Sequence, residues 1–176
     1  MKIENLSMGD VSQGRYPSWC IQENTYLIQI QDGLSWTFVN AKNRGKFAGY
    51  SQFRFDDTDR HTDAFAISDK EAEKIAEILK DCAAKKLDIL VHCHAGICRS
   101  GAVVEAAVAC LGYEDPKRYR NPNTLVKRKL FKALGHEYTE SIYEEIFYGY
   151  DKAGNMIVYD KNGYEIKIGE VKKDEG

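Results

Sequence analysis

The segment that decides the fold of this chain is residues 92–101, which read His92-Cys93-His94-Ala95-Gly96-Ile97-Cys98-Arg99-Ser100-Gly101. Residues 88–91 ahead of it, Asp88-Ile89-Leu90-Val91, predict a short buried strand, and residues 102–112 behind it predict a helix. A tight loop from a strand into a helix directs several backbone N–H groups and the positive end of the helix dipole at one point. The segment therefore predicts an anion-binding loop.

Cys93 and Arg99 stand at the two ends of this loop, with five residues between them. The loop dipoles and the Arg99 guanidinium favour the thiolate form of Cys93, which makes it a nucleophile at neutral pH. An arginine suits a phosphate because its planar fork donates to two oxygens at once. The alternative is that Cys93 is a small core residue, as buried cysteines often are. Core packing does not account for an arginine at this spacing.

The segment resembles the signature of the cysteine-dependent protein phosphatases, the superfamily of tyrosine-specific and dual-specificity enzymes. The resemblance implies that Cys93 attacks phosphorus, that Arg99 binds two phosphate oxygens and that Ser100 assists the later steps. It also implies that the phosphate is bound by the loop residues His94, Ala95, Gly96, Ile97, Cys98 and Arg99. No cofactor is expected.

The resemblance favours a phosphoprotein or phosphopeptide substrate, with phosphotyrosine first and phosphoserine or phosphothreonine as further candidates. Residues 94–98 contain no lysine, whereas the phosphoinositide phosphatases of the superfamily usually carry lysines there. The basic side chains in residues 117–132 could steer acidic phosphopeptides or touch RNA, but a solvated helix face is the simpler interpretation. Four alternatives stay open: a pseudophosphatase that only reads phosphate, a phosphatase for another phosphomonoester, an RNA 5′-phosphatase and a rhodanese-like sulfurtransferase.

A proton donor for the leaving oxygen is expected on a loop ahead of the first long helix, as in the superfamily. The acidic cluster there contains Asp56, Asp57 and Asp59. Asp57 is the first choice, because Asp57-Thr58 resembles the superfamily's turn and precedes the cysteine at a similar distance. Asp59 and then Asp56 follow. The alternative is that all three carboxylates cap loops, which is the usual role of such clusters.

Three further polar residues belong to the same segment. His92 is expected to pack under the loop and support it, and His94 is expected at the pocket rim. Cys98 matches a cysteine in the loop of the low-molecular-weight tyrosine phosphatases, which implies a reversible disulfide between Cys93 and Cys98. The alternative is that Cys98 only lines the pocket. The order of the chain, with a central loop and an acid upstream of it, fits the dual-specificity phosphatases better than the low-molecular-weight phosphatases.

The fold class predicted from the pattern is α/β, a central mostly parallel sheet flanked by helices, phosphatase-like, with a C-terminal β-hairpin. The expected strands are residues 26–30, 36–39, 52–55 and 88–92. Ser68 and Glu71 form a capping box, which predicts a helix from residue 69 onward. Further helices are expected at residues 102–112, 124–134 and about 137–148.

The chain is expected to divide into a catalytic domain, residues 1–149, and an appended hairpin with a charged tail, residues 150–176. Residues 156–158 and 165–168 predict strands, and Asn162-Gly163 is a strong two-residue turn signal.

Composition excludes several other classes of protein. The chain has 176 residues and a net charge of −2, which does not favour a nucleic-acid or membrane partner. No charged and apolar leader is seen, so a cytoplasmic location is expected.

The five cysteines are odd in number and lack the spacing of a disulfide framework. His92, Cys93, His94 and Cys98 lack a second ligand pair, so no metal is expected. The sequence does not indicate an oligomeric state.

Overall fold

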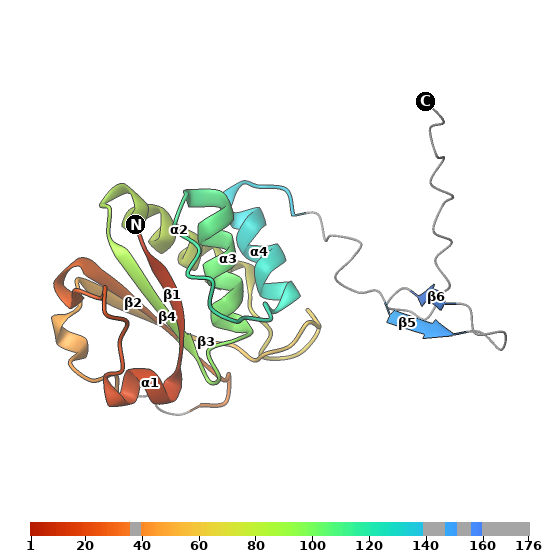
Figure 1. Ribbon diagram of the computed structural model, residues 1–176, viewed down its shortest axis with the longest axis horizontal. Helices are drawn as coiled ribbons and strands as arrows, with labels where there is room; N and C mark the ends of the chain where they lie inside the picture. The colour runs from red at the N-terminus through yellow and green to blue at the C-terminus, as the bar shows by residue number, and fades with distance from the viewer. Residues whose placement is uncertain (36–39, 139–146, 151–155, 160–176) are drawn as a thin grey trace. The chain divides into compact units, whose positions relative to one another are not determined.

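The computed structural model describes residues 1–35, 40–138, 147–150 and 156–159 (Figure 1). The chain divides into two compact units, residues 1–138 and residues 139–176. Each unit is described by itself.

The first unit is built on a four-stranded sheet with the strand order β1-β4-β2-β3. The strands are β1 (Ile3–Ser7), β2 (Thr25–Gln31), β3 (Gly49–Arg54) and β4 (Asp88–Cys93). Every neighbouring pair runs parallel. The central strands β2 and β4 are buried along most of their length, which accounts for the apolar residues at 27–28 and 89–91.

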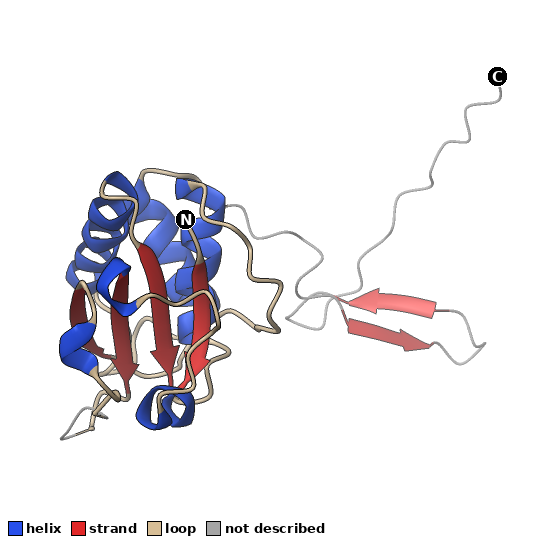
Figure 2. Ribbon diagram, turned by 60° about the vertical axis from the view of Figure 1, so that its left-hand side comes forward, coloured by secondary structure: helices blue, strands red, loops and turns tan. Residues whose placement is uncertain are grey.

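Three helices pack on one face of the sheet: α2 (Asp69–Ala84), α3 (Arg99–Leu111) and α4 (Thr124–Leu134) (Figure 2). The main apolar core lies between them and the sheet, and includes Ile28, Ile75 and Val103. A smaller core forms around Leu6, Leu27 and Leu90, together with the short helix α1 (Met8–Gln13). Two short 3₁₀ helices, η1 (Gln22–Asn24) and η2 (Arg44–Lys46), complete this unit.

Local signals define the ends of these helices. Ser68 accepts a hydrogen bond from the backbone N–H of Glu71, and the Glu71 carboxylate accepts one from the N–H of Ser68, so the predicted capping box is present. Asn123 caps α4 by accepting from the N–H of Val126. Gly135 ends α4 with a φ of 84°, a left-handed conformation that glycine adopts without steric cost.

The predicted α/β class, the parallel sheet and the helices at 102–112 and 124–134 are confirmed. The predicted strands at 26–30, 52–55 and 88–92 correspond to β2, β3 and β4, although β3 begins earlier and ends at Arg54. The expected strand at 36–39 lies outside the described residues. β1 and α1 were not predicted. A five-residue strand followed at once by a six-residue helix is too short to show the periodicity of a strand or of a helix.

The helix expected at about 137–148 is wrong at both ends. Glu137 and Tyr138 are not helical, and β5 (Phe147–Tyr150) pairs antiparallel with β6 (Met156–Tyr159) in the second unit. The aromatic content of Phe147-Tyr148-Gly149-Tyr150 suits a strand better than a helix. The strand predicted at 156–158 lies within β6. The turn at Asn162-Gly163 and the strand at 165–168 lie outside the described residues, and the domain boundary at 149 stays a prediction.

Candidate active site

The loop between β4 and α3 lies at the carboxyl end of the parallel sheet, where ligands of open α/β sheets usually bind (Figure 1). Cys93 is the last residue of β4, Cys98 is the N-cap of α3, and Arg99 is the first residue of that helix. The strand-loop-helix arrangement predicted from residues 92–101 is therefore present. It directs the N-terminal end of α3 at the loop.

The loop is held against β1 by backbone and side-chain contacts. Asn5 donates from Nδ2 to the carbonyl oxygen of Gly96 at 2.6 Å, and the N–H of Met8 donates to the carbonyl of His94 at 3.1 Å. Gly96 has a φ of 75°, and a Cβ at this position would lie 2.4 Å from the carbonyl carbon of Leu6. Only glycine fits between the loop and β1.

A pocket of about 260 Å³ opens over this loop. Its lining residues are Asp32, Asp57, Cys93, His94, Ala95, Cys98 and Arg99. The pocket therefore brings together the predicted nucleophile, the predicted phosphate-binding arginine and the first-choice acid. Asp32 was not singled out from the sequence, because an acidic residue after a strand is indistinguishable there from an ordinary turn residue.

Cys93 is 2% exposed, and its Sγ lies 3.2 Å from Oγ of the buried Ser100. When the sulfur is a thiolate, the hydroxyl can donate to it. Ser100 is therefore close enough to stabilise the sulfur as a nucleophile and, later, as a leaving group.

The guanidinium of Arg99 is buried and only partly paired. Its Nη1 donates to the carbonyl oxygen of Phe55 at 2.8 Å and lies 2.8 Å from Oδ1 of Asp32. Its Nε is buried and has no hydrogen-bond partner among the described residues. A buried donor without a partner costs about 1–3 kcal/mol. An anion bound by the Arg99 side chain would satisfy this N–H, as the predicted role of Arg99 requires.

The three candidate acids have different surroundings. Asp56 accepts from the N–H of Gly33 at 2.8 Å, and Asp59 accepts from the N–H and hydroxyl of Thr124 at the start of α4. These two carboxylates therefore have the loop-capping role that the alternative gave to all three. Asp57 lines the pocket with Cys93. The geometry favours Asp57 over both neighbours.

Asn123 positions Asp57, and the sequence analysis did not assign it a role. Its Nδ2 donates to Oδ1 of Asp57 at 2.9 Å and to the carbonyl of Thr58 at 3.2 Å. Its backbone N–H donates to the carbonyl of Cys98 at 3.1 Å. One buried asparagine thus connects the acid loop, the loop before α3 and the start of α4. In the sequence, Asn121-Pro122-Asn123 predicts the start of a helix, but neither this signal nor the segment's similarity to the dual-specificity phosphatases identifies Asn123 as the partner of Asp57.

His92 is fully buried under the loop, as expected. Burial lowers its pKa to about 4, and the nearby Arg99 charge acts in the same direction. His92 is therefore neutral near neutral pH. Its Nε2 lies 3.1 Å from Nε2 of Gln29, and Gln52 donates to Oε1 of Gln29 at 3.3 Å. Because Gln29 then donates through its amide nitrogen, Nε2 of His92 accepts.

Cys98 is partly buried at the pocket wall. Burial raises the pKa of its thiol to about 11, and the hydrogen bond to Asp57 and the charges of Asp57 and Cys93 act in the same direction. Cys98 is therefore a thiol near neutral pH and can donate to the Asp57 carboxylate. Ile97 and Gly96 complete the loop, and Gly96 is buried.

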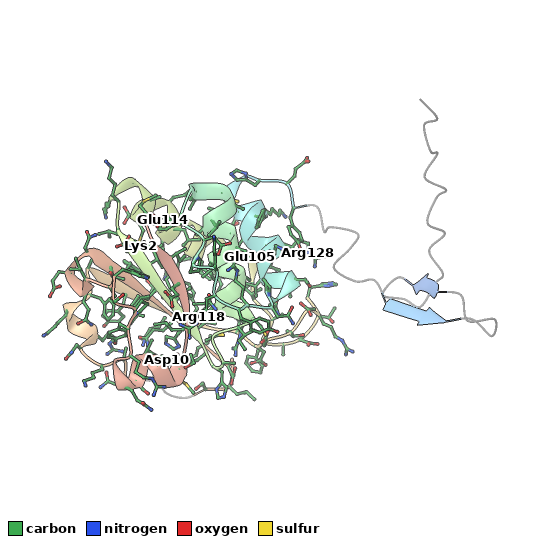
Figure 3. The ribbon with its side chains drawn as sticks, in the orientation of Figure 1. Lys2, Asp10, Glu105, Glu114, Arg118 and Arg128 are labelled. Atoms are coloured by element: carbon green, nitrogen blue, oxygen red, sulfur yellow. The ribbon has the colours of Figure 1, made fainter. Side chains whose placement is uncertain are left out.

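Four of the seven basic side chains in residues 117–132 pair with acidic side chains of the described residues, namely Arg118, Arg120, Lys127 and Lys129. Arg118 pairs with Glu4 at 2.8 Å and with Asp10 at 3.4 Å, and Figure 3 labels Arg118 and Asp10 side by side. Lys127 pairs with Glu105 at 2.9 Å. These contacts support the simpler interpretation of a structured surface rather than a nucleic-acid site.

Within the described residues, no three histidine, cysteine or acidic side chains cluster as metal ligands would. In the same part of the chain, no helix has both the length and the apolar character that a membrane span requires.

The chain is similar in structure to the crystal structure of the human tyrosine phosphatase-like serine/threonine/tyrosine-interacting protein. The TM-score is 0.55 and the sequence identity is 18%, over 74% of this chain and 89% of that chain. This similarity shows that the chain has a tyrosine phosphatase-like fold, as residues 92–101 predicted. No protein-family model matches the chain, and no curated protein matches its sequence.

Proposed function

We propose that this protein is a cysteine-dependent phosphatase that hydrolyses phosphomonoesters on a protein or peptide substrate, with phosphotyrosine as the preferred substrate. The observation that carries the proposal is the convergence of Cys93, Arg99 and Asp57 on one pocket. Each of these residues supplies a different requirement of phosphoryl transfer: the nucleophile, the phosphate-binding cation and the proton donor.

In the first step, the Cys93 thiolate attacks phosphorus, and an S–P bond forms while the bond to the leaving oxygen breaks. Asp57, in its protonated form, donates its proton to that oxygen. The loop N–H groups and Arg99 stabilise the charge on the phosphoryl oxygens. The proton lost by Asp57 leaves with the alcohol or phenol, so the carboxylate is ready to act as a base.

In the second step, water attacks the phosphorus of the cysteinyl-phosphate. Asp57 takes a proton from the water, the S–P bond breaks, and the thiolate of Cys93 returns as inorganic phosphate forms. Ser100 supports this step because its hydroxyl, 3.2 Å from Sγ, can donate to the departing sulfur. The cycle uses only groups of this chain and water.

The pocket wall bears on how many phosphates the substrate carries. The lining residues include no lysine, and the cationic group among them is the Arg99 guanidinium. A single phosphate is therefore matched better than a polyphosphorylated headgroup. A phosphate-reading pseudophosphatase is the second candidate, because the similar human protein is described as phosphatase-like.

Hydrolysis of a generic aryl phosphate in EDTA and reductant tests the proposal. The variant is Cys93→Ser, and the matched control is Cys110→Ser, near the far end of α3. Metal-independent turnover that Cys93→Ser abolishes and Cys110→Ser retains is the expected result. Absence of turnover with retained phosphopeptide binding would favour the phosphate-reading module.

A further inference from the structure

Asp32 brings a negative charge into a pocket that the proposed function assigns to phosphate. It follows the last residue of β2, and its side chain is 59% exposed. Its Oδ1 lies 2.8 Å from Nη1 of Arg99, and both residues line the pocket with Cys93. The guanidinium that would bind an incoming phosphate is thus already paired with a carboxylate.

Arg99 is held in place without this carboxylate. The same Nη1 donates to the carbonyl oxygen of Phe55 in a buried hydrogen bond of 2.8 Å. An ion pair to a carboxylate that is more than half exposed contributes little to stability, because water screens it. The contact with Asp32 is therefore weak enough to be displaced and is not needed to orient the guanidinium.

The backbone around Asp32 is fixed to the acid loop. The N–H of Gly33 donates to Oδ1 of Asp56, and the N–H of Asp56 donates to the carbonyl of Phe65. Gly33 also lies directly against the Phe65 ring, since a Cβ on Gly33 would fall 2.5 Å from ring carbons. Only the Asp32 side chain is left to rotate, so its charge stays near the pocket after it leaves Arg99.

We propose that Asp32 is an internal competitor for the phosphate site, which weakens the binding of phosphomonoesters and of the inorganic phosphate product. This inference rests on the proposed function, because it assumes that the pocket takes phosphate. Two effects act in the same direction: the Asp32 carboxylate offsets part of the positive charge of Arg99, and its negative charge repels a phosphate bound beside it. The consequence is faster product release at the expense of substrate affinity.

The test measures inorganic phosphate binding to the full chain by titration calorimetry at fixed ionic strength. The variants are Asp32→Asn, which keeps the shape of the side chain, and Asp32→Ala, which removes it. The control is Glu23→Gln, which removes the same charge from η1 at the opposite end of β2. Thermal unfolding verifies that each variant is folded.

Both Asp32 variants should bind phosphate about fivefold more tightly than the unmodified chain, which corresponds to about 1 kcal/mol. Glu23→Gln should leave the affinity unchanged. Equal or weaker binding in both Asp32 variants would overturn the inference and make Asp32 a residue that positions Arg99. If the unmodified chain and all folded variants bind no phosphate, the proposed function fails, and the inference fails with it.

Discussion

Replacing Asp57 by asparagine separates the proposed proton donor from its two acidic neighbours. Asparagine has the same shape, and its carbonyl oxygen can still accept the 2.9 Å hydrogen bond from Asn123. The loop should therefore keep its conformation, while the side chain can no longer give or take a proton. Loss of a general acid–base group lowers the rate by roughly 10²–10⁴-fold. We expect Asp57→Asn to lower kcat by a factor in that range.

The matched control is Asp59→Asn. Asp59 accepts hydrogen bonds from Thr124 and Leu125 at the start of α4, so its loss should act on stability. Asparagine can still accept these hydrogen bonds, so the variant loses only the interaction of the negative charge with the helix N-terminus, about 0.3–1 kcal/mol. We expect Asp59→Asn to lower the free energy of unfolding by that amount and to change kcat little.

The assay is steady-state hydrolysis of two aryl phosphates, one with a good and one with a poor leaving group. A poor leaving group depends more on protonation, so Asp57→Asn should slow its hydrolysis more. Phosphate affinity, measured separately, should not fall, because the variant removes a negative charge from the pocket wall. Equal kcat in Asp57→Asn and the unmodified chain, or a larger loss in Asp59→Asn, would refute the assignment of the acid.

Three further predictions follow from the residues around the pocket. Asn123→Ala should lower the free energy of unfolding, measured by denaturant titration, by about 2 kcal/mol because α4 loses its N-cap. The same variant should lower kcat, because Asp57 loses the hydrogen bond that holds it in place. Burial lowers the pKa of His92 to about 4, so the folded state binds this proton at a lower pH than the unfolded state does. The free energy of unfolding should therefore fall as the pH drops from about 6.5 to about 4. The slope of the unfolding free energy against pH should be shallower in His92→Gln, and an identical slope would contradict the burial argument. Peroxide should link Cys93 to Cys98 reversibly, and mass spectrometry that finds only unpaired, over-oxidised Cys93 would exclude the disulfide.

Residues 92–101 allowed much of the fold and the centre of the site to be predicted, because each residue type there has a local cause. Gly96 is required by a positive φ and by its close approach to Leu6, and Arg99 begins a helix whose dipole faces the loop. Such constraints act within a few residues and are therefore visible in the sequence. The capping box at Ser68 belongs to the same kind of signal.

The residues that escaped prediction act across long sequence separations. Asn5 holds the loop through Gly96, Asn123 holds Asp57, and Asp32 reaches Arg99. Their partners are set by the strand order β1-β4-β2-β3, which no local pattern encodes. The choice among Asp56, Asp57 and Asp59 also depended on tertiary contacts, because adjacent carboxylates in one loop look alike until their partners are known.

We propose Cys93 as the nucleophile of a metal-independent phosphatase. Hydrolysis of an aryl phosphate in EDTA and reductant by the unmodified chain and by Cys93→Ser tests it most directly. We expect turnover by the former and none by the latter, with phosphate binding retained in both. Equal turnover by the two proteins would contradict it, because the activity would then arise from another site.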